Sequence, residues 1–525
     1  MSLKNLKRML GLSREFNQGR KLVVNCEKLE TRMAMVEDGV LEEYTIERIN
    51  DDRLVGSIFK GRVKNIEQGL KAMFVDIGFE KNAFLHFWDA IPAALDGGME
   101  EIQRGGRPKA KKKRITSRDI PSIYPAGSEV LIQVTKGPIG TKGPRVTTNI
   151  SLPGRYLVLM PYNEQFGISR KVDDPKERQR LRKIMEKLTV PEGMGVIMRT
   201  VATGKRLRHF VRDLSVLLED WQAIENAKAN KPAPVCAFQE PDLVGRSVRD
   251  FLTEDVDEVI CDSEETADRM RELAAPISKR SMRKIHHLST PGPIFDELGI
   301  EKQIADAFHR QVWLKCGGYL VIDETEAMIT VDVNTGRNRG SKNVEKMITE
   351  TNVEAAEEVA RQLRLRNIGG LVVVDFIDMK GRKDQQAVYR AMKERLKRDK
   401  AKTQVLHISQ LGLMEMTRQR LHESLSDTLY DRCPYCSGNG KIKSTMSMSV
   451  ELQRTLTGLI GKQGIGDLVI VVHPEVMDRL RSEDSDLLVE LERRHTGRFT
   501  FRSDPTQHRE QIKYLDAAGG EEIKL

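Results

Sequence analysis

The sequence has little cysteine, few aromatic residues and no long hydrophobic run. Six cysteines are scattered over 525 residues, which is too sparse for a disulfide framework. Aromatic residues make up only 5%. No run reaches the roughly 18 apolar residues of a membrane-spanning helix, and the basic N-terminal segment lacks an apolar stretch of signal-peptide length. These absences lead us to expect a cytoplasmic protein without a transmembrane segment.

What the sequence does have is length and positive charge. A chain of 525 residues exceeds the roughly 250 to 300 residues that one hydrophobic core can serve, so we expect about three to five structural units. The formal net charge is +9 and the isoelectric point is about 9.1. This excess of lysine and arginine favours a polyanionic partner, because these side chains displace counterions around phosphates.

The N-terminal part of the chain predicts a small antiparallel barrel. Residues 55–87 alternate short β-rich runs with glycine-containing turns, and Val130–Val134 supplies a further strand. Between them, residues 104–114 (RGGRPKAKKKR) form a basic insertion with the composition of a mobile loop. Its run Lys109–Arg114 is either a solvated charge cluster or a source of salt-sensitive, nonspecific affinity for polyanions.

Residues 170–310 predict mixed α/β structure. A helical pattern covers Lys176–Leu188, and strands are predicted at Gly195–Met198 and at residues 256–262. Pro232 and Pro234 indicate a boundary between units.

Residues 316–412 carry the clearest pattern. Gly317–Asp323 and Ala327–Val333 are predicted strands, Val344–Arg366 is a long helix, and Leu371–Val374 is a short apolar run typical of a buried strand. This order predicts an α/β sheet. In the helix, apolar residues share one face and arginines lie off it: Ile348, Ala355, Ala356, Val359 and Leu363 on the face, and Arg361, Arg364 and Arg366 elsewhere.

Acidic residues lie where two of these strands expose a face or end. Side chains alternate along a strand, so Asp332 and Asn334 point away from the core, and Asp375 follows an apolar strand with Asp378 just beyond. Two carboxylates from neighbouring strand ends can bind Mg2+, which prefers oxygen ligands. The alternative is that these acids cap strands or face solvent, and the spacing alone does not decide between the two.

Cys433 and Cys436 have the spacing of half a zinc site. Gly438 and Gly440 free the backbone to wrap a metal, but zinc normally takes four ligands and the chain has no second pair. The simplest completion is the same pair from a second subunit, which predicts a homodimer. A redox pair or two unligated thiols are the alternatives, although the strand and helix context typical of thioredoxin is missing.

Three stretches resemble the catalytic core of the ribonuclease E/G family. They are VDVNTGR at 331–337, TNVEAAEEVARQLRLRNIGGLVVVDFIDM at 351–379 and HISQLGLMEMTRQR at 407–420. The resemblance implies that Asp332 and Asp375 hold a catalytic Mg2+ and that Asn334 orients the site. It also implies that Cys433 and Cys436 share a structural Zn2+ between subunits.

The resemblance extends to residues that would contact RNA. In the barrel, which is similar to an oligonucleotide-binding fold, Phe74 and Lys136 match the family's RNA-binding positions; Phe59 and His86 either add to them or pack the barrel core. GMGVIMRT at 193–200 resembles the pocket for the RNA 5′ end, where Arg199 and Thr200 would bind a terminal monophosphate. Without the resemblance, Arg199 would be an ordinary surface residue.

The implied fold class is multidomain α/β and β, in the short, ribonuclease G-like form of the family. The expected units are an RNase H-like subdomain at 1–52 and 244–306, an OB-type RNA-binding barrel with the basic insertion at 53–137, a 5′-end sensor at 138–243, a DNase I-like catalytic subdomain at 307–428, a zinc link at 429–442 and a small dimerisation domain at 443–525.

The resemblance implies a magnesium-dependent endoribonuclease. Its substrate would be single-stranded, A/U-rich RNA, cut to 5′-phosphate and 3′-hydroxyl ends and stimulated by a 5′-monophosphate, in rRNA and tRNA processing and mRNA decay. A noncatalytic RNA-binding scaffold, which broken metal ligands would indicate, and a zinc-dependent redox regulator, which reactive thiols would indicate, are the alternatives. RNA targets, protein partners and the pairing of dimers into tetramers stay open.

Overall fold

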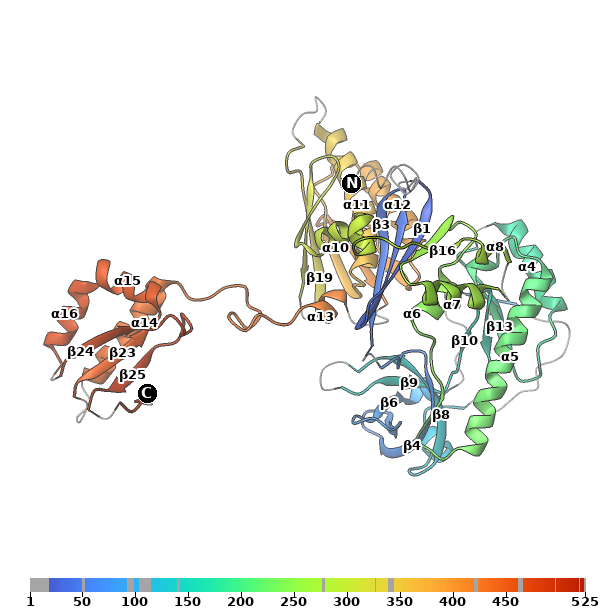
Figure 1. The fold of residues 1–525 in the computed structure, drawn as a ribbon, viewed down its shortest axis with the longest axis horizontal. Coiled ribbons are helices and arrows are strands. Elements are labelled where there is room, and N and C mark those ends of the chain that lie inside the picture. The colour runs from blue at the N-terminus through green and yellow to red at the C-terminus, as the bar shows by residue number, and fades with distance from the viewer. Residues whose placement is uncertain are drawn as a thin grey trace. The chain divides into compact units, whose positions relative to one another are not determined.

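The computed structural model of the chain has two compact units, Met1–Thr428 and Leu429–Leu525 (Figure 1). The described residues are all except 1–17, 50–51, 92–98, 103–114, 139–141, 173, 276–278, 326, 339–343, 420–423, 461–465, 496, 519 and 524–525. The basic insertion at 104–114 therefore lies outside the described residues. None of the helices in the described ranges combines the length and the apolar character that crossing a membrane requires.

Two segments far apart in the sequence form the first sheet. Strands β1 (Arg20–Cys26), β2 (Glu30–Glu37) and β3 (Val40–Arg48) form an antiparallel meander, and β15 (Glu258–Cys261) and β16 (Ile285–His287) add in parallel beside β1. The associated helices are α6 (Leu243–Asp250), α7 (Glu264–Ala274), α8 (Lys279–Met282), α9 (Ile294–Glu297) and α10 (Ile300–Phe308). The chain between β3 and β15 forms other sheets, so this subdomain is interrupted; its RNase H-like character stays a prediction.

A closed five-stranded barrel occupies part of the interruption, as the sequence predicts. Its strands are β4 (Ile58–Glu67), β5 (Ala72–Asp76), β6 (Ala83–His86), β9 (Arg145–Thr147) and β8 (Glu129–Lys136), in that spatial order, with β4 pairing back onto β8. The short helices η1 (Phe87–Ala90) and α3 (Ile120–Ile123) accompany it. Beyond the proline pair, β14 (Val235–Phe238) pairs with β4, so this strand and β9 both lie outside the range 53–137 predicted for the barrel.

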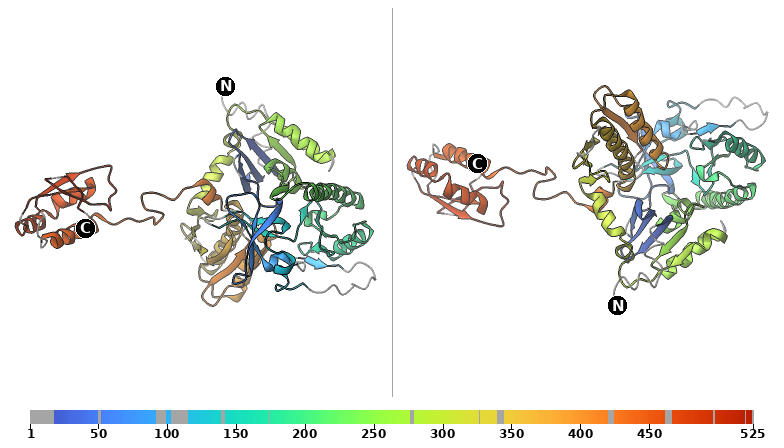
Figure 2. Two further views of the ribbon diagram at one scale, coloured as in Figure 1. Left: turned by 90° about the horizontal axis from the view of Figure 1, so that it is seen from below. Right: turned by 90° about the horizontal axis from the view of Figure 1, so that it is seen from above.

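The second inserted sheet has the order β10-β11-β13-β12-β7. Its strands are β7 (Met99–Glu101), β10 (Leu152–Pro153), β11 (Leu157–Met160), β12 (Phe166–Ser169) and β13 (Gly195–Met198). Helices α4 (Pro175–Lys187) and α5 (Leu207–Asn230) pack against it, and the 3-10 turn η2 (Thr200–Ala202) follows β13 (Figure 2). Asp174 caps α4 by accepting from the Lys176 backbone N–H.

The last sheet of the first unit matches the α/β pattern predicted for residues 316–412. Its order is β17-β18-β19-β20-β22-β21. The strands are β17 (Gln311–Trp313), β18 (Tyr319–Glu324), β19 (Met328–Asn334), β20 (Gly370–Asp375), β21 (Thr403–Val405) and β22 (Leu413–Arg418). Helices α11 (Val344–Leu365) and α12 (Arg382–Leu396) share one hydrophobic core with the sheet (Figure 1). Short α13 spans Leu425–Leu429.

The arginines that lie off the apolar face of α11 are buried by a second layer. Arg364 and Arg366 are only 7% and 5% exposed. Arg364 Nη2 lies 2.5 Å from Glu42 Oε2 on β3, and Arg366 donates to the backbone oxygen of His309. The helix therefore packs between this six-stranded sheet and the first sheet, and its polar stripe forms buried ion pairs and hydrogen bonds rather than facing solvent.

The second unit is a small α/β domain. Its three-stranded sheet has the order β24-β23-β25, with β23 (Leu468–Val472), β24 (Phe499–Ser503) and β25 (Lys513–Asp516). Helices α14 (Thr445–Ile460), α15 (Pro474–Ser482) and α16 (Ser485–Arg493) surround it and share its hydrophobic core.

Candidate functional site

Asp332 and Asp375 lie directly opposite each other on neighbouring parallel strands. β19 and β20 pair in register from Met328 with Leu371 to Asp332 with Asp375. Buried and exposed residues alternate along β19, which leaves Asp332 on the exposed face that the sequence predicts. Apolar β20 ends at Asp375, whose side chain is also exposed. Two carboxylates therefore share one face at the same end of the sheet.

The environment of these carboxylates is strongly negative. The limited burial of Asp375 and the negative charges of Asp332 and Asp378 raise the pKa of Asp375. Asn334 Nδ2 donates a hydrogen bond to Asp332 Oδ2 at 2.8 Å, which orients that carboxylate. Like charges opposite each other destabilise a sheet, so a bound cation would stabilise this arrangement. The oxygen donors gathered here are those that hard divalent cations prefer.

Asn352 on α11 is a positioning residue that the sequence reasoning missed. It is fully buried, and its side chain makes two hydrogen bonds to the main chain of Ile377: Nδ2 donates to the oxygen at 2.7 Å, and Oδ1 accepts from the N–H at 3.1 Å. These bonds fix the segment between Asp375 and Asp378. The signal was present in the sequence, because Asn352 occupies an apolar-face position, three and seven residues before Ala355 and Val359.

One row of side chains on the barrel combines aromatic rings with basic groups. Phe74 on β5 pairs with Phe84 on β6, Phe84 pairs with Arg145 on β9, and Arg145 pairs with Lys136 on β8. The rings of Phe74 and Phe84 pack edge to face at 5.8 Å, and both are partly exposed. Sequence reasoning missed Phe84, although its alternation with buried Ala83 and Leu85 marks it as outward-facing.

The two additional barrel candidates have different positions. Phe59 is 5% exposed and belongs to the barrel core, so the prediction that it stacks on RNA is wrong and core packing is confirmed. β4 turns its side chain inward, in edge contact with Phe79. His86 is half-buried, and its Nδ1 accepts from the Trp88 backbone N–H at 3.2 Å.

Arg199 and Thr200 follow directly after β13, at the start of η2. Arg199 Nη1 forms an ion pair with Asp250 Oδ1 at 2.8 Å and donates to the Gly154 oxygen at 2.5 Å, while Thr200 is exposed. Burial alone would raise the pKa of Asp250, but the positive charges of Arg199 and Arg249 outweigh it and hold that pKa at about 2. Sequence reasoning missed Asp250, because nothing in the sequence links positions on different sheets.

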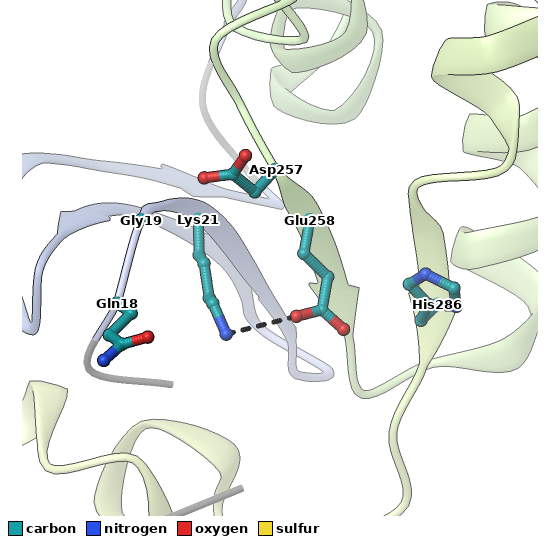
Figure 3. Close-up of a pocket in the computed structure, with 6 residues that line it drawn as sticks. All are labelled: Gln18, Gly19, Lys21, Asp257, Glu258 and His286. Atoms are coloured by element: carbon teal, nitrogen blue, oxygen red, sulfur yellow. Dashed lines mark ion pairs between the residues drawn. The ribbon is translucent and has the colours of Figure 1, made fainter. Parts of the chain in front are cut away.

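A cavity of about 1110 Å³ joins several of these elements. Its lining includes Lys136 from the barrel, Asp250 from α6 and Arg364 from α11. A second cavity, of about 440 Å³, lies where β1, β15 and β16 meet (Figure 3). There Lys21 Nζ pairs with Glu258 Oε2 at 3.3 Å, and the lining includes none of the predicted site residues. Of the predicted RNA-contacting residues, the lining of the larger cavity includes Lys136.

Cys433 and Cys436 lie in an exposed turn ahead of α14. Backbone N–H groups of Cys436 and Tyr435, and then the Cys436 thiol, lower the pKa of the Cys433 thiol. Gly440 N–H donates to Cys436 Sγ at 3.3 Å, and Ser437 has a positive φ of 49°. Thiolates are the form that binds zinc, so the turn suits a metal ligand pair. The strand and helix context typical of a thioredoxin redox pair is missing, as the sequence indicated: neither cysteine lies directly between a strand and a following helix.

A different group of three potential metal ligands is found within the described ranges. Ligand atoms of Cys26, Cys261 and Asp262 lie within 4.8 Å of one another, at the edge of the first sheet. The Asp262 carboxylate already accepts from the Cys26 N–H at 2.8 Å and from Asn25 Nδ2 at 2.6 Å. The Asp262 carboxylate thus connects β1 to the end of β15. None of the predicted site residues belongs to this group of three.

Two family models match the chain. One, described as the ribonuclease E/G family, matches residues 151–421, and one described as the thioredoxin-like domain of RNase E/G matches residues 432–516. The second match covers both Cys433 and Cys436 and gives the C-terminal domain a class that the sequence reasoning did not assign.

Several curated proteins are similar over nearly the whole chain. Ribonuclease G of Escherichia coli (strain K12) is 37% identical over 472 residues, covering 90% of this chain and 94% of that protein. Ribonuclease G of Haemophilus influenzae is 36% identical, with the same coverage. Ribonuclease E of Haemophilus influenzae is 36% identical over 91% of this chain but only 50% of its own length.

Proposed function

The chain belongs to the ribonuclease E/G family and is an endoribonuclease, and from this premise we propose that it hydrolyses single-stranded RNA with the aid of Mg2+ held by Asp332 and Asp375. The single observation that carries the proposal is the register of β19 and β20, which brings these two carboxylates opposite each other. We propose A/U-rich cleavage sites, products with 5′-phosphate and 3′-hydroxyl ends, and roles in rRNA and tRNA processing and mRNA decay.

The donor set fits magnesium. Asp332 and Asp375 offer carboxylate oxygens, Asp378 adds negative charge, and no sulfur or imidazole ligand is among them. Limited burial and the negative charges of Asp332 and Asp378 raise the pKa of Asp375, and a cation would stabilise the two opposed carboxylates. A bound Mg2+ would supply charge neutralisation at the phosphate and lower the pKa of a water molecule.

The protein's own contribution is orientation. Asn334 holds one Asp332 oxygen by its hydrogen bond, so the carboxylate keeps one rotamer. Asn352 fixes the chain that follows Asp375, so both metal-binding carboxylates are attached to rigid backbone. In the proposed reaction, water attacks phosphorus and gives up a proton to the solvent, the bond to the 3′-oxygen breaks, and that oxygen takes up a proton from the solvent and leaves as the 3′-hydroxyl.

The barrel row supports binding of unpaired RNA. Phe74 offers a ring on which a base can stack, and Lys136 lies on the same row to neutralise a phosphate. Stacking needs an unpaired base, which accounts for a preference for single strands.

Arg199 and Thr200 would bind the 5′-monophosphate. The guanidinium group can donate two parallel hydrogen bonds to phosphate oxygens, and the exposed hydroxyl can add a third. The pairing with Asp250 holds the guanidinium in place before RNA arrives. A terminal phosphate bound here would anchor the RNA and increase cleavage at sites that reach the carboxylates.

Cys433 and Cys436 would supply half of a zinc site. Backbone N–H groups lower the pKa of the Cys433 thiol, and Cys436 Sγ accepts from the Gly440 N–H; two more ligands would come from the same turn of a second subunit. This gives a homodimer with one shared Zn2+, which can pair further into a tetramer.

Substitution of the acidic pair tests the proposed function. With an internally labelled RNA and Mg2+, we expect Asp332→Asn and Asp375→Asn each to reduce cleavage by about a hundredfold or more, because each removes one metal-binding charge. Asp323→Asn, on neighbouring β18, is the control and should cleave normally. Full cleavage by either site variant, or by wild type in EDTA, would refute the metal assignment. RNA binding without any cleavage by the wild type would indicate the scaffold alternative.

A further inference from the structure

A large aromatic side chain lies exposed on β17, the edge strand of the six-stranded sheet that contains Asp332 and Asp375. Trp313, at the end of β17, is 54% exposed. Its ring contacts that of Tyr319 on β18, with centroids 5.3 Å apart and the planes 59° to each other. Within the described part of the chain, these two rings form a continuous aromatic surface at the edge of the sheet.

The sheet register places this surface in line with the acidic pair. Trp313 pairs with Tyr319, and Tyr319 pairs with Asn334, which is two residues from Asp332 on the same face of β19. Strands lie about 4.8 Å apart, so Trp313 is roughly 10 Å across the sheet from the Asn334 row. A strand of RNA rises about 3.4 Å per nucleotide when stacked and more when extended, so this separation spans roughly one to three nucleotides.

A fixed loop positions a positive charge over the aromatic surface. Arg337 Cζ lies 5.4 Å from the centroid of the Trp313 ring. The Arg337 backbone N–H donates to the Gly317 oxygen at 2.9 Å, and Asn338 Nδ2 donates to Thr351 Oγ1 at 3.1 Å, so the loop after β19 is tied to its neighbours. Gly336 has a φ of 54°, and a side chain there would meet the Gly317 oxygen and the Tyr319 ring.

Among the described side chains, none neutralises the charge of Arg337. Among the residues that the structure describes, no carboxylate lies within ion-pair distance of its guanidinium group. The site therefore combines an exposed ring on β17, a second ring beside it on β18 and an available cation on the loop that follows Asn334. These are the groups that bind a base and its phosphate in single-stranded nucleic acid.

We propose that Trp313, Tyr319 and Arg337 form a subsite that stacks one unpaired nucleobase of the RNA beside Asp332 and Asp375. The subsite rests on the proposed function, and it would fix the position of the strand relative to the cleaved phosphodiester. Because every base has a flat aromatic face, the subsite selects for an unpaired nucleotide rather than for a particular base.

Abasic substitution in the RNA tests the subsite. A series of 5′-monophosphorylated oligonucleotides with one cleavage site is prepared. Each member of the series has a single abasic nucleotide at a different position beside the cut. We expect wild-type kcat/KM to fall roughly tenfold to a hundredfold at one position. Trp313→Ala should show that loss on the intact RNA and no further loss from the abasic nucleotide at that position. Trp313→Phe should retain the position-specific loss, and Trp313→Leu should not.

Controls separate the possible failures. Gln311→Ala, on the same strand and face, should keep the wild-type profile, and thermal unfolding should show that the variants are folded. An unchanged abasic profile in Trp313→Ala or Trp313→Leu would overturn the subsite while leaving the cleavage function intact. A change of oligomeric mass in Trp313→Ala with an unchanged profile would also overturn it, in favour of a protein contact. Absence of cleavage by the wild type with Mg2+ would instead refute the proposed function.

Discussion

The contact between Arg199 and Asp250 joins two parts of the first unit that are separate in the sequence. Arg199 extends from the end of β13 and Asp250 ends α6, and their ion pair of 2.8 Å lies in partly buried surroundings. A guanidinium group already oriented by a carboxylate loses less side-chain freedom when phosphate binds. At the scale of single residues, the proposed 5′ pocket would depend on a fixed arginine whose partner comes from helix α6.

Replacement of Arg199 should remove the preference for a 5′-monophosphate. We expect Arg199→Gln to bring the ratio of kcat/KM for 5′-monophosphate and 5′-hydroxyl RNA to about one, because the charged donor for the terminal phosphate is lost. Cleavage of the 5′-hydroxyl RNA should be unchanged. Arg208→Gln, an exposed arginine on nearby α5, is the matched control. A preference that persists in Arg199→Gln would show that the 5′ phosphate is bound elsewhere.

Helix α11 links the proposed metal-binding carboxylates, Asp332 and Asp375, to the rest of the first unit. One face packs on the sheet that contains β19 and β20, and its buried arginines contact the first sheet. Asn352, on the same helix, holds the main chain of Ile377 after β20. Helix α11 therefore contacts both sheets and also holds the main chain that follows β20 in place.

Loss of the Asn352 side chain should weaken metal binding more than RNA binding. We expect Asn352→Ala to raise the Mg2+ concentration for half-maximal cleavage by about tenfold and to lower kcat more than it changes KM, since the carboxylates lose their fixed position. Two backbone groups left without partners should also cost about 2 to 4 kcal/mol of stability. Asn149→Ala, which removes an amide that holds Ile91 in the barrel, should destabilise the protein without changing the Mg2+ dependence. An unchanged Mg2+ requirement in Asn352→Ala would contradict this role.

The strands and the long helix of the six-stranded sheet were predictable because their patterns of apolar and polar residues are local. Alternation in β19 and the apolar run of β20 gave the correct strands, and the amphipathic pattern gave α11 to within one residue of its end. The register that opposes Asp332 and Asp375 was not visible in the sequence, since it depends on pairing across a long helix. The sequence left Phe59 open between RNA contact and core packing for the same reason, because which face of β4 points inward depends on the closure of the barrel.

At the scale of the whole molecule, the chain consists of two units, and the cysteine turn lies at the start of the second. The first unit extends to Thr428, and Cys433 and Cys436 follow within the second. Each chain offers two thiols there, which is half of a tetrahedral zinc site. Dimer formation and zinc content are therefore linked in the proposed account.

Removal of zinc should dissociate the dimer. We expect one Zn2+ per two chains by elemental analysis, and a halved mass by sedimentation for Cys433→Ser and Cys436→Ser. The matched control is Cys236→Ser, because this exposed cysteine lies on β14 of the barrel sheet. One zinc per chain, or an unchanged mass after zinc removal, would contradict the shared site.

The central claim is that Asp332 and Asp375 contact the catalytic cation directly, and a change of ligand tests this most directly. A thiolate binds Mg2+ poorly but binds softer cations well. The measurement is cleavage of one 5′-monophosphorylated RNA by Asp375→Cys across concentrations of Mg2+ and of Mn2+. We predict a loss of about a hundredfold or more with Mg2+ and substantial recovery with Mn2+. Wild-type cleavage by Asp375→Cys with Mg2+ would contradict the account.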